Sequence, residues 1–467
     1  MTPGLPQPRT IRGRAIGGAL AALALFLTGC TGSGPAPATS GNAASSTPPP
    51  PMISDFNPQL VAAAKEEAKA NAGGQQLGGK VTFIGSTGGA EGQLLQTLFQ
   101  PFTEATGIAV DYQGTSNVDA IVQTQLAAGK PPDFVQQNSI GGMFGYAQKG
   151  VLTPLDSFID KNTLDKNFAP SVISGLSSEG HLYGAPGAIN TFQVWYNPKV
   201  YTGPKDAMID QLLGWATNAT KAGARAPFCM NLNQGSNSAT IAIYFIEEIF
   251  LKKYGPVEFE KWARGDIKYT SEEVKSVYQE VLDLFTHNLV QGGAQGALTT
   301  PIIQSPTGLF TNPPGCELLH WGSFTPGVIA QANPNVRAGV DYDYFNMANS
   351  SASFPKTIYA APWTSYAMTN TPQLQAFVKY YTSTAFQTLV ASTGHWVMAN
   401  KAIPSATYPS AVQQKLATDF GAADTIEFGP FLNASAAGYQ HQKDAFMELV
   451  ANPTNLDKFL QGMDSSR

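Results

Sequence analysis

Charged residues are scarce in this chain: they make up only 13% of its 467 residues, and the formal net charge is −5. Lysine and arginine form no run that could neutralise a row of phosphates or lipid headgroups. A surface for nucleic acid or for an anionic membrane needs clustered positive charge, so neither partner is expected. Hydrophobic residues reach 43% and aromatic residues 10%, which is enough to fill a large core. The composition therefore indicates a globular protein.

The short motifs of common enzymes are also missing. No Ser has Gly at both −2 and +2, and the sequence contains no H-E-x-x-H, C-x-x-C, G-x-G-x-x-G or P-loop pattern. Ser353 and Lys356 fit S-x-x-K, but Pro355 would fall inside the helical turn that must align them. The histidines lack the spacing of metal ligands, so neither a metal nor a cofactor is expected. They are His181, His287, His320, His395 and His441.

A glycoside hydrolase needs only two carboxylates about 5 to 10 Å apart, which the sequence does not exclude. The conceivable members are Glu91, Asp119, Asp133, Glu317 and Glu427. For each of them, a surface or capping carboxylate is the simpler interpretation.

The N-terminus has the pattern of a secretion signal. Three arginines precede an apolar run over 15–27, and Leu27-Thr28-Gly29-Cys30 resembles the lipobox of bacterial lipoproteins. The run is short for a transmembrane anchor, which is the alternative. We expect residues 1–29 to be removed and Cys30 to be lipidated, so that the protein is anchored to the outer face of the cell membrane. Residues 30–55, rich in Gly, Ser, Thr and Pro, would form a flexible tether.

Three cysteines are present in all. If Cys30 carries lipid, Cys229 and Cys316 remain in an oxidising compartment, and we expect them to form a disulfide. Two buried free thiols are the alternative.

Strand and helix patterns alternate after an N-terminal helix over about 58–71. Short apolar segments at 81–85, 108–112 and 133–135 read as strands. Apolar residues recur at helical spacing from Leu94 to Phe102, and a further helix is expected over about 239–253. Strands that alternate with helices predict a largely parallel sheet.

Ligands of open α/β sheets bind outside the carboxyl ends of the strands. Three segments are therefore site candidates: 85–91, 114–119 and 136–139, all rich in hydroxyls, amides and glycines. A sugar additionally needs aromatic faces for its C–H surface. Four tryptophans lie in surroundings rich in Gly, Pro and Ser, although a core role remains open for each: Trp195, Trp321, Trp363 and Trp396.

Several segments, in order along the chain, match a known family. They are 90–92, 99–102, 106–108, 129–133, 150–156, 182–186, 190, 195–197 and 394–401, with the cysteines at 229 and 316. On these residues the chain resembles the extracellular solute-binding proteins of family 1, the lipid-anchored receptors of bacterial ABC importers. It is most similar to the branch that binds alpha-glucosides and other oligosaccharides.

This resemblance implies an α/β fold of the periplasmic-binding-protein, maltose-binding-protein type, with two lobes, a hinge and a ligand cleft between the lobes. After an N-terminal helical segment over 56–78, the first lobe would comprise 79–188 and 325–362. The second would comprise 189–324 and 363–467. The implied function is capture of a carbohydrate and its delivery to a membrane ABC permease, by a monomer without catalytic activity. Sugar binding would favour the closed state by its differential affinity.

The ligand-binding residues follow from loop placement and family position. They are Ser86, Thr87, Glu91, Asn117, Gln137, Asn138, Asn190 and Asn233, with Trp321, Trp363 and Trp396 stacking on the sugar. The segments 136–139 and 321–324 depart from the family pattern, so the pocket chemistry has changed. Few charges line these segments, which favours a neutral polyol. A secreted hydrolase, or a receptor that signals to a membrane sensor kinase, is the alternative function.

Overall fold

The computed structural model of the protein describes residues 51–221 and 225–466. The expected signal peptide, the lipidation site at Cys30 and the tether as far as residue 50 lie outside these residues. Within the described ranges, no helix combines the length and the apolar character that a membrane span requires. The expected N-terminal helix is α1 (Pro58–Asn71), which begins after Asn57 because that side chain accepts a hydrogen bond from the N–H of Gln59 (2.9 Å).

Five strands form the first sheet, in the order β2-β1-β3-β11-β6. Their bounds are β1 (Lys80–Gly85), β2 (Ala109–Gly114), β3 (Phe134–Gln137), β6 (Gly184–Ala185) and β11 (Thr364–Ala367). Strand β1 is parallel to both β2 and β3, which confirms the predicted parallel arrangement, whereas β11 is antiparallel to β3. The carboxyl ends of β1, β2 and β3 therefore lie at one edge of this sheet.

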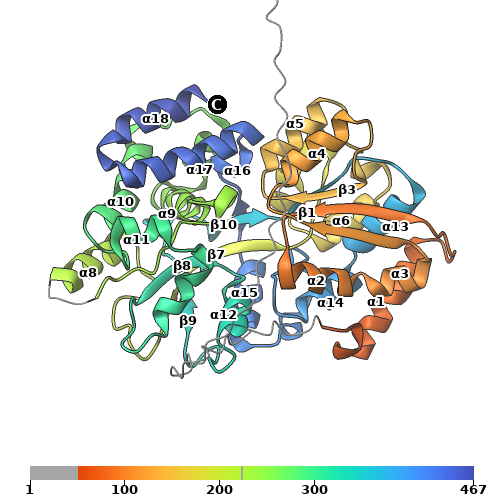
Figure 1. Cartoon of the computed structure of the whole chain (residues 1–467), viewed down its shortest axis with the longest axis horizontal. Helices are drawn as coiled ribbons and strands as arrows, with labels where there is room; N and C mark the ends of the chain where they lie inside the picture. The colour runs from red at the N-terminus through yellow and green to blue at the C-terminus, as the bar shows by residue number, and fades with distance from the viewer. Residues whose placement is uncertain (1–50, 222–224, 467) are drawn as a thin grey trace, which may run out of the picture. The chain divides into compact units, whose positions relative to one another are not determined.

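Helices surround the first sheet (Figure 1). They include α2 (Gly89–Leu98), α3 (Gln100–Thr106), α4 (Val118–Ala127), α5 (Ile140–Gln148), α6 (Lys161–Asn167), α7 (Pro170–Gly175), α13 (Pro372–Tyr381) and α14 (Thr384–Ala391). The helical pattern expected from Leu94 to Phe102 is divided into α2 and α3, because Pro101 has no N–H to donate to the carbonyl of Thr97. The rings of Tyr112 and Phe134 both lie 4.9 Å from that of Phe83, in the core.

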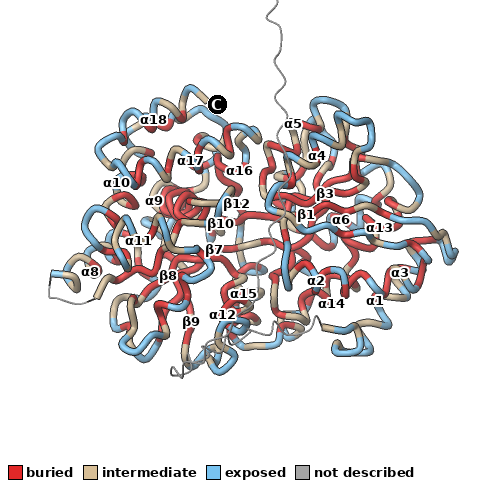
Figure 2. Tube along the Cα trace, in the orientation of Figure 1, coloured by how far each residue is buried: buried red, intermediate tan, exposed pale blue. Residues whose placement is uncertain are grey.

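The second sheet has the order β12-β10-β7-β8, and β9 also pairs with β7. Its strands are β7 (Ile189–Tyr196), β8 (Leu318–Gly322), β9 (Asp343–Phe345), β10 (Thr357–Pro362) and β12 (Thr425–Glu427). Its helices include α8 (Ile209–Lys221), α9 (Thr240–Arg264), α10 (Glu272–Thr286), α11 (Gly293–Thr299), α12 (Thr325–Ala332), α15 (Ala411–Gly421), α16 (Pro430–Asn433), α17 (Ala436–Ala451) and α18 (Leu456–Ser465). In each half the buried residues follow the strands and the inner helix faces (Figure 2).

The strand pairing contradicts part of the expected lobe limits. Residues 325–362 were expected in the first lobe, yet β9 and β10 pair with β7 of the second sheet. Conversely, β11 pairs with β3, and α13 and α14 contact α1, so 363–391 lies with the first sheet. Only Trp363 separates β10 from β11, and no local signal in so short a link shows that the chain changes sheets there. The chain crosses between the lobes at 186–188, at Trp363 and again between α14 and α15, and these links form the hinge.

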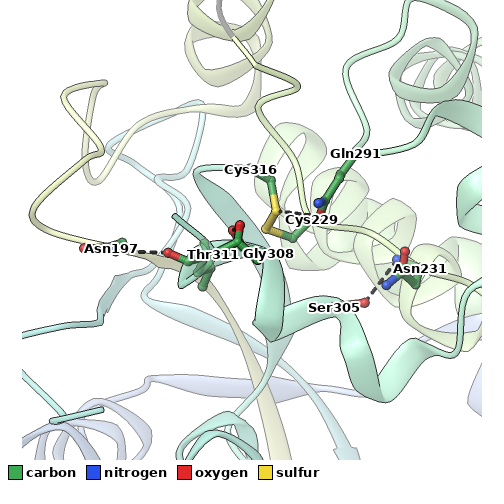
Figure 3. The surroundings of a disulfide bond; sticks show 9 residues. Asn197, Cys229, Asn231, Gln291, Ser305, Gly308, Thr311 and Cys316 are labelled. Carbon is green, nitrogen blue, oxygen red and sulfur yellow. Dashed lines mark hydrogen bonds between the residues drawn. A yellow bond between two sulfur atoms is a disulfide. The ribbon is translucent and has the colours of Figure 1, made fainter. Parts of the chain in front are cut away.

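Cys229 and Cys316 form a disulfide, the expected pair, with their Cα atoms 5.4 Å apart (Figure 3). It holds the segment before β8 against the segment that leads into α9. The backbone N–H of Cys229 donates to the carbonyl of Leu318 (2.7 Å), and the N–H of Asn231 donates to the hydroxyl of Ser305 (3.1 Å). Gly308 has no side chain because a Cβ atom there would overlap the Cys316 sulfur. The bond therefore fixes the loops on which β8 and its Trp321 depend.

Candidate functional site

A cavity of about 400 Å³ has walls from both lobes. Residues of the first lobe come from the end of β1, the start of α2 and the end of β3, and residues of the second come from β8, α9 and α12. The lining is Ser86, Thr87, Gly88, Ala90, Glu91, Asn138, Asn190, Gln234, Ile241, Ile302, Ile303, Trp321, Phe324, Val328, Gln331, Trp363 and Trp396. We call it the central cavity.

The first-lobe wall is held by hydrogen bonds at the carboxyl end of β1. The backbone N–H of Ser86 donates to Gln136 Oε1 (3.0 Å), and Tyr112 OH donates to the carbonyl of Thr87 (2.6 Å). A Cβ atom on Gly114 would overlap the Thr87 carbonyl, so glycine is required beside this loop. These contacts fix the two hydroxyl groups at the cavity wall.

Glu91 is the single carboxylate among the described residues that line the central cavity. It lies in the first turn of α2, where the helix dipole favours a negative charge. Burial nevertheless raises the pKa of Glu91 above its usual value, because a charged carboxylate loses hydration there. A half-buried acceptor of this kind is suited to the hydroxyls of a neutral ligand.

Aromatic side chains form much of the remaining wall. The rings of Trp363 and Trp396 are 5.1 Å apart, and those of Trp321 and Phe324 are 4.8 Å apart, both in edge-to-face geometry. The indole N–H of Trp321 is buried and has no hydrogen-bond partner among the described residues. The backbone of Trp321 is fixed, since Trp195 Nε1 donates to its carbonyl (3.0 Å). The cavity thus offers apolar faces and an unused donor.

The structure brings eight of the eleven predicted residues together in the central cavity. They are Ser86, Thr87, Glu91, Asn138, Asn190, Trp321, Trp363 and Trp396. Asn117 and Gln137 line a second cavity of about 340 Å³, which shares Ser86 and Asn138 with the first. Gln137 Oε1 is buried and has no hydrogen-bond partner in the described part of the chain.

Asn233 lines neither cavity, contrary to expectation. Its side-chain N–H donates to the carbonyl of Thr299 (3.2 Å), and its own carbonyl accepts from Ile302 (2.8 Å). The turn thereby directs the next residue, Gln234, to the central cavity instead. The sequence therefore predicted the correct loop for the cavity wall but the wrong side chain within it.

Sequence reasoning missed much of the second-lobe wall. Gln234, Phe324, Val328 and Gln331 line the central cavity, and three of them lie on or next to α12. One signal was available for Phe324: Gly322 precedes it by two residues, and a Cβ atom at 322 would overlap the Phe324 ring.

The second cavity, beside α4, contains a group of each charge, Asp119 and Lys443, whereas the described lining of the central cavity contains only Glu91. Lys443 on α17 donates from Nζ to the carbonyl of Ser236 (2.6 Å) and lies over the Tyr439 ring at 4.3 Å. Burial lowers the pKa of Lys443 to about 8, and burial raises the pKa of Asp119 on α4. In the described part of the chain, no cluster of three or more His, Cys, Asp or Glu side chains is placed to hold a metal ion.

Two α/β lobes, short hinge links and an aromatic, polar cavity lined from both sides define a receptor of the periplasmic-binding type. A family model for the bacterial extracellular solute-binding proteins matches residues 86–388. The chain belongs to this family.

Two known relatives align with most of the chain. It is 25% identical over 359 residues to the osmoprotective compounds-binding protein GgtB of Synechocystis sp., covering 75% of this chain and 83% of that protein. It is 28% identical over 325 residues to the alpha-glucosides-binding periplasmic protein AglE of Rhizobium meliloti, covering 66% and 69%. A solved chitin oligosaccharide binding protein superposes with a TM-score of 0.69 at 18% identity, covering 83% of this chain and 97% of that chain, which supports the fold.

Proposed function

We propose that the protein captures a neutral carbohydrate in the central cavity and delivers it to a membrane ABC permease. The observation that carries this proposal is the convergence of Trp321, Trp363 and Trp396 with Glu91 in one cavity. Indole faces pack against the C–H face of a sugar, and a carboxylate accepts hydrogen bonds from its hydroxyls. Relatives named for alpha-glucosides and for osmoprotective compounds make an alpha-glucoside or another oligosaccharide the first candidate.

The charge of the central cavity disfavours an anionic ligand. Glu91 has no lysine or arginine beside it in the lining, so an anionic sugar would meet an uncompensated carboxylate. The adjacent cavity, with Asp119 and Lys443, would receive further polar groups of a longer ligand. An oligosaccharide would therefore extend from the aromatic wall towards α4.

A hydrolase is less well supported than a receptor. Cleavage of a glycosidic bond requires two carboxylates on opposite sides of that bond. Among the described residues of the central cavity, Glu91 alone is acidic. Turnover of an aryl glycoside by the purified protein would overturn this assignment.

The N-terminal features complete the proposal. Lipidation at Cys30 would hold the protein at the outer face of the cell membrane. Of the predicted tether 30–55, residues 53–55 form a helical turn, and residues 31–52 before it would span roughly 25 Å. A permease in the same membrane would then receive the loaded protein at short range, with the protein acting as a monomer. Radiolabelled palmitate incorporation, lost in Cys30→Ala, tests the anchor.

A thermal-shift screen of the purified protein tests the ligand class. Mono-, di- and oligosaccharides are compared with amino acids and peptides, and a ligand at a hundred times its Kd adds about 2.7 kcal/mol to the free energy of unfolding. A shift with one class of sugar supports the proposal. A shift with amino acids or peptides alone would leave the fold standing and refute the carbohydrate assignment.

A further inference from the structure

A separate cavity of about 420 Å³ lies in the second lobe and shares no lining residue with the central cavity. Its floor contains Gln193 of β7 with Glu248 and Lys252 of α9, and its cover is the loop 346–356 that joins β9 to β10. We call it the α9 cavity.

The α9 cavity originates in a gap between two strands. Strand β9 pairs with β7 at 194–196 and β10 pairs with β7 at 189–191, so Phe192 and Gln193 lack a partner strand on that edge. The loop between β9 and β10 must arch over the gap. No strand fills the position beside Phe192 and Gln193 on that edge, so space remains there beneath the loop.

A kink in α9 holds the covering loop in place. Pro256 has no N–H for the carbonyl of Lys252, and the backbone N–H of Ser350 donates to that carbonyl instead (2.8 Å). The Ser350 hydroxyl donates to the next carbonyl, that of Lys253 (2.6 Å). Gly255 has a φ of 82°, and a Cβ there would come within 2.9 Å of the Phe354 ring, so glycine lets the loop approach. The cavity is thus bounded by anchored elements.

Two ammonium groups are present in the lining. Lys252 is 8% exposed and uses one of its three N–H donors on the carbonyl of Thr357 (2.7 Å). Lys356 lies at the mouth, and its ammonium makes no ion pair with any described carboxylate within 4.0 Å. Burial lowers the pKa of Lys252, Glu248 raises it, and the charge of Lys356 lowers it further. Glu248 therefore compensates the charge of Lys252 in part, and a bound anion would compensate the remaining positive charge of the two ammonium groups.

Two further polar groups of the lining are a carboxylate that has a partner and an amide oxygen that has none among the described residues. Glu248 Oε2 lies 2.7 Å from His320 Nε2, so this carboxylate already has a partner. Gln193 is 4% exposed; its Nε2 donates to Thr191 Oγ1 (2.8 Å), while its Oε1 has no partner among the described residues. A buried amide oxygen without a donor is costly, and a ligand hydroxyl would satisfy it.

We propose that the α9 cavity is a second binding site, for a small oxyanion that also carries a hydroxyl, such as a hydroxycarboxylate or a polyol phosphate. The oxyanion accepts from Lys252 and Lys356, and the hydroxyl donates to Gln193 Oε1. The volume is within the range of small-molecule sites.

Calorimetric titration of the full-length protein in detergent tests this site with three probes: inorganic phosphate, glycerol 3-phosphate and L-lactate, with glycerol as the neutral control. We expect saturable binding of glycerol 3-phosphate or lactate, at least tenfold weaker in Lys356→Met. The exposed Lys130 serves as the matched control, and Lys130→Met should bind as the unmodified protein does. Lys252→Met should abolish anion binding if this variant folds. If it does not fold, the comparison of Lys356→Met with Lys130→Met decides the test.

Sugar binding is measured in the same preparations, so failure of this site is distinguishable from failure of the carbohydrate proposal. Trp396→Ala should lose sugar affinity and keep oxyanion binding. The α9 cavity assignment is refuted if none of the three anions binds to a protein that binds sugar, or if Lys356→Met and Lys130→Met bind the anion equally well.

Discussion

Replacing Trp396 by alanine is expected to weaken sugar binding at least tenfold without unfolding the protein. The indole lines the central cavity, is 4% exposed and meets Trp363 edge to face at 5.1 Å. Only about 10 Å² of a Trp that is 4% exposed is accessible with the lobes in this arrangement, so the sugar reaches the ring face when the lobes part; a pyranose that then covers about 60 Å² of the ring would contribute about 1.5 kcal/mol at about 25 cal/mol per Å². That energy corresponds to roughly a tenfold change in Kd. Isothermal titration with the sugar identified in the screen measures it.

The same substitution removes packing, so stability must be measured beside affinity. Truncating a buried Trp costs about 3 to 5 kcal/mol of stability, which would lower the midpoint of thermal unfolding in any case. Trp215 is the matched control, because it makes a similar contact with Tyr201 (4.9 Å) but lies outside the central cavity. Trp215→Ala should lose stability and keep its affinity. Unchanged affinity in folded alanine variants of Trp321, Trp363 and Trp396 would refute the reasoning.

Three further predictions concern charge and cross-linking. Burial raises the pKa of Glu91, so the carboxylate should be protonated, and the affinity for a neutral sugar should fall, at a higher pH than the ordinary pKa of glutamate would give. Titrations across the acid range measure this fall, and Glu91→Gln should remove it. Burial first, and repulsion from Glu260 second, raise the pKa of Glu427 to about 7, so the native state holds this proton more tightly. The free energy of unfolding should therefore fall as pH rises from 4.5 through about 7, by less than about 3 kcal/mol given the partial exposure of Glu427, and urea unfolding of Glu427→Gln should lack that fall. Reducing the disulfide between Cys229 and Cys316 opens a loop of 87 residues and should cost about 4 to 5 kcal/mol in the chain-entropy model, seen as a lower urea midpoint in reductant.

Local patterns were sufficient to predict the three parallel strands of the first sheet. Each of β1, β2 and β3 is a short apolar segment followed by a helical period, and their parallel pairing follows from that alternation. The same rule placed Ser86, Thr87, Glu91 and Asn138 in one cavity, because the carboxyl ends of parallel strands meet at one edge.

Non-local pairing determined what the sequence did not predict. Strand β10 joins the second sheet and β11 joins the first, although Trp363 alone separates them, and this depends on the partner strands β7 and β3. Asn233 lies outside the central cavity for a different reason. Its side-chain N–H donates to the carbonyl of Thr299, and a polar side chain in a loop can bond either to the backbone or to a ligand.

The lobe contacts away from the hinge indicate where the energy of closure must originate. Ser236 Oγ donates to the Ser116 carbonyl at 3.3 Å and Ser139 Oγ to the Ala434 carbonyl at 3.4 Å, and bonds of this length contribute about 1 kcal/mol each at most. Shifting a population from 1:99 to 99:1 requires about 5.5 kcal/mol of differential affinity. Contacts with one wall alone are made in the open and the closed state alike, so only a ligand that touches Glu91 on one wall and Trp321 on the other can supply that difference. A sugar too short to span from Glu91 to Trp321 would therefore bind without driving closure.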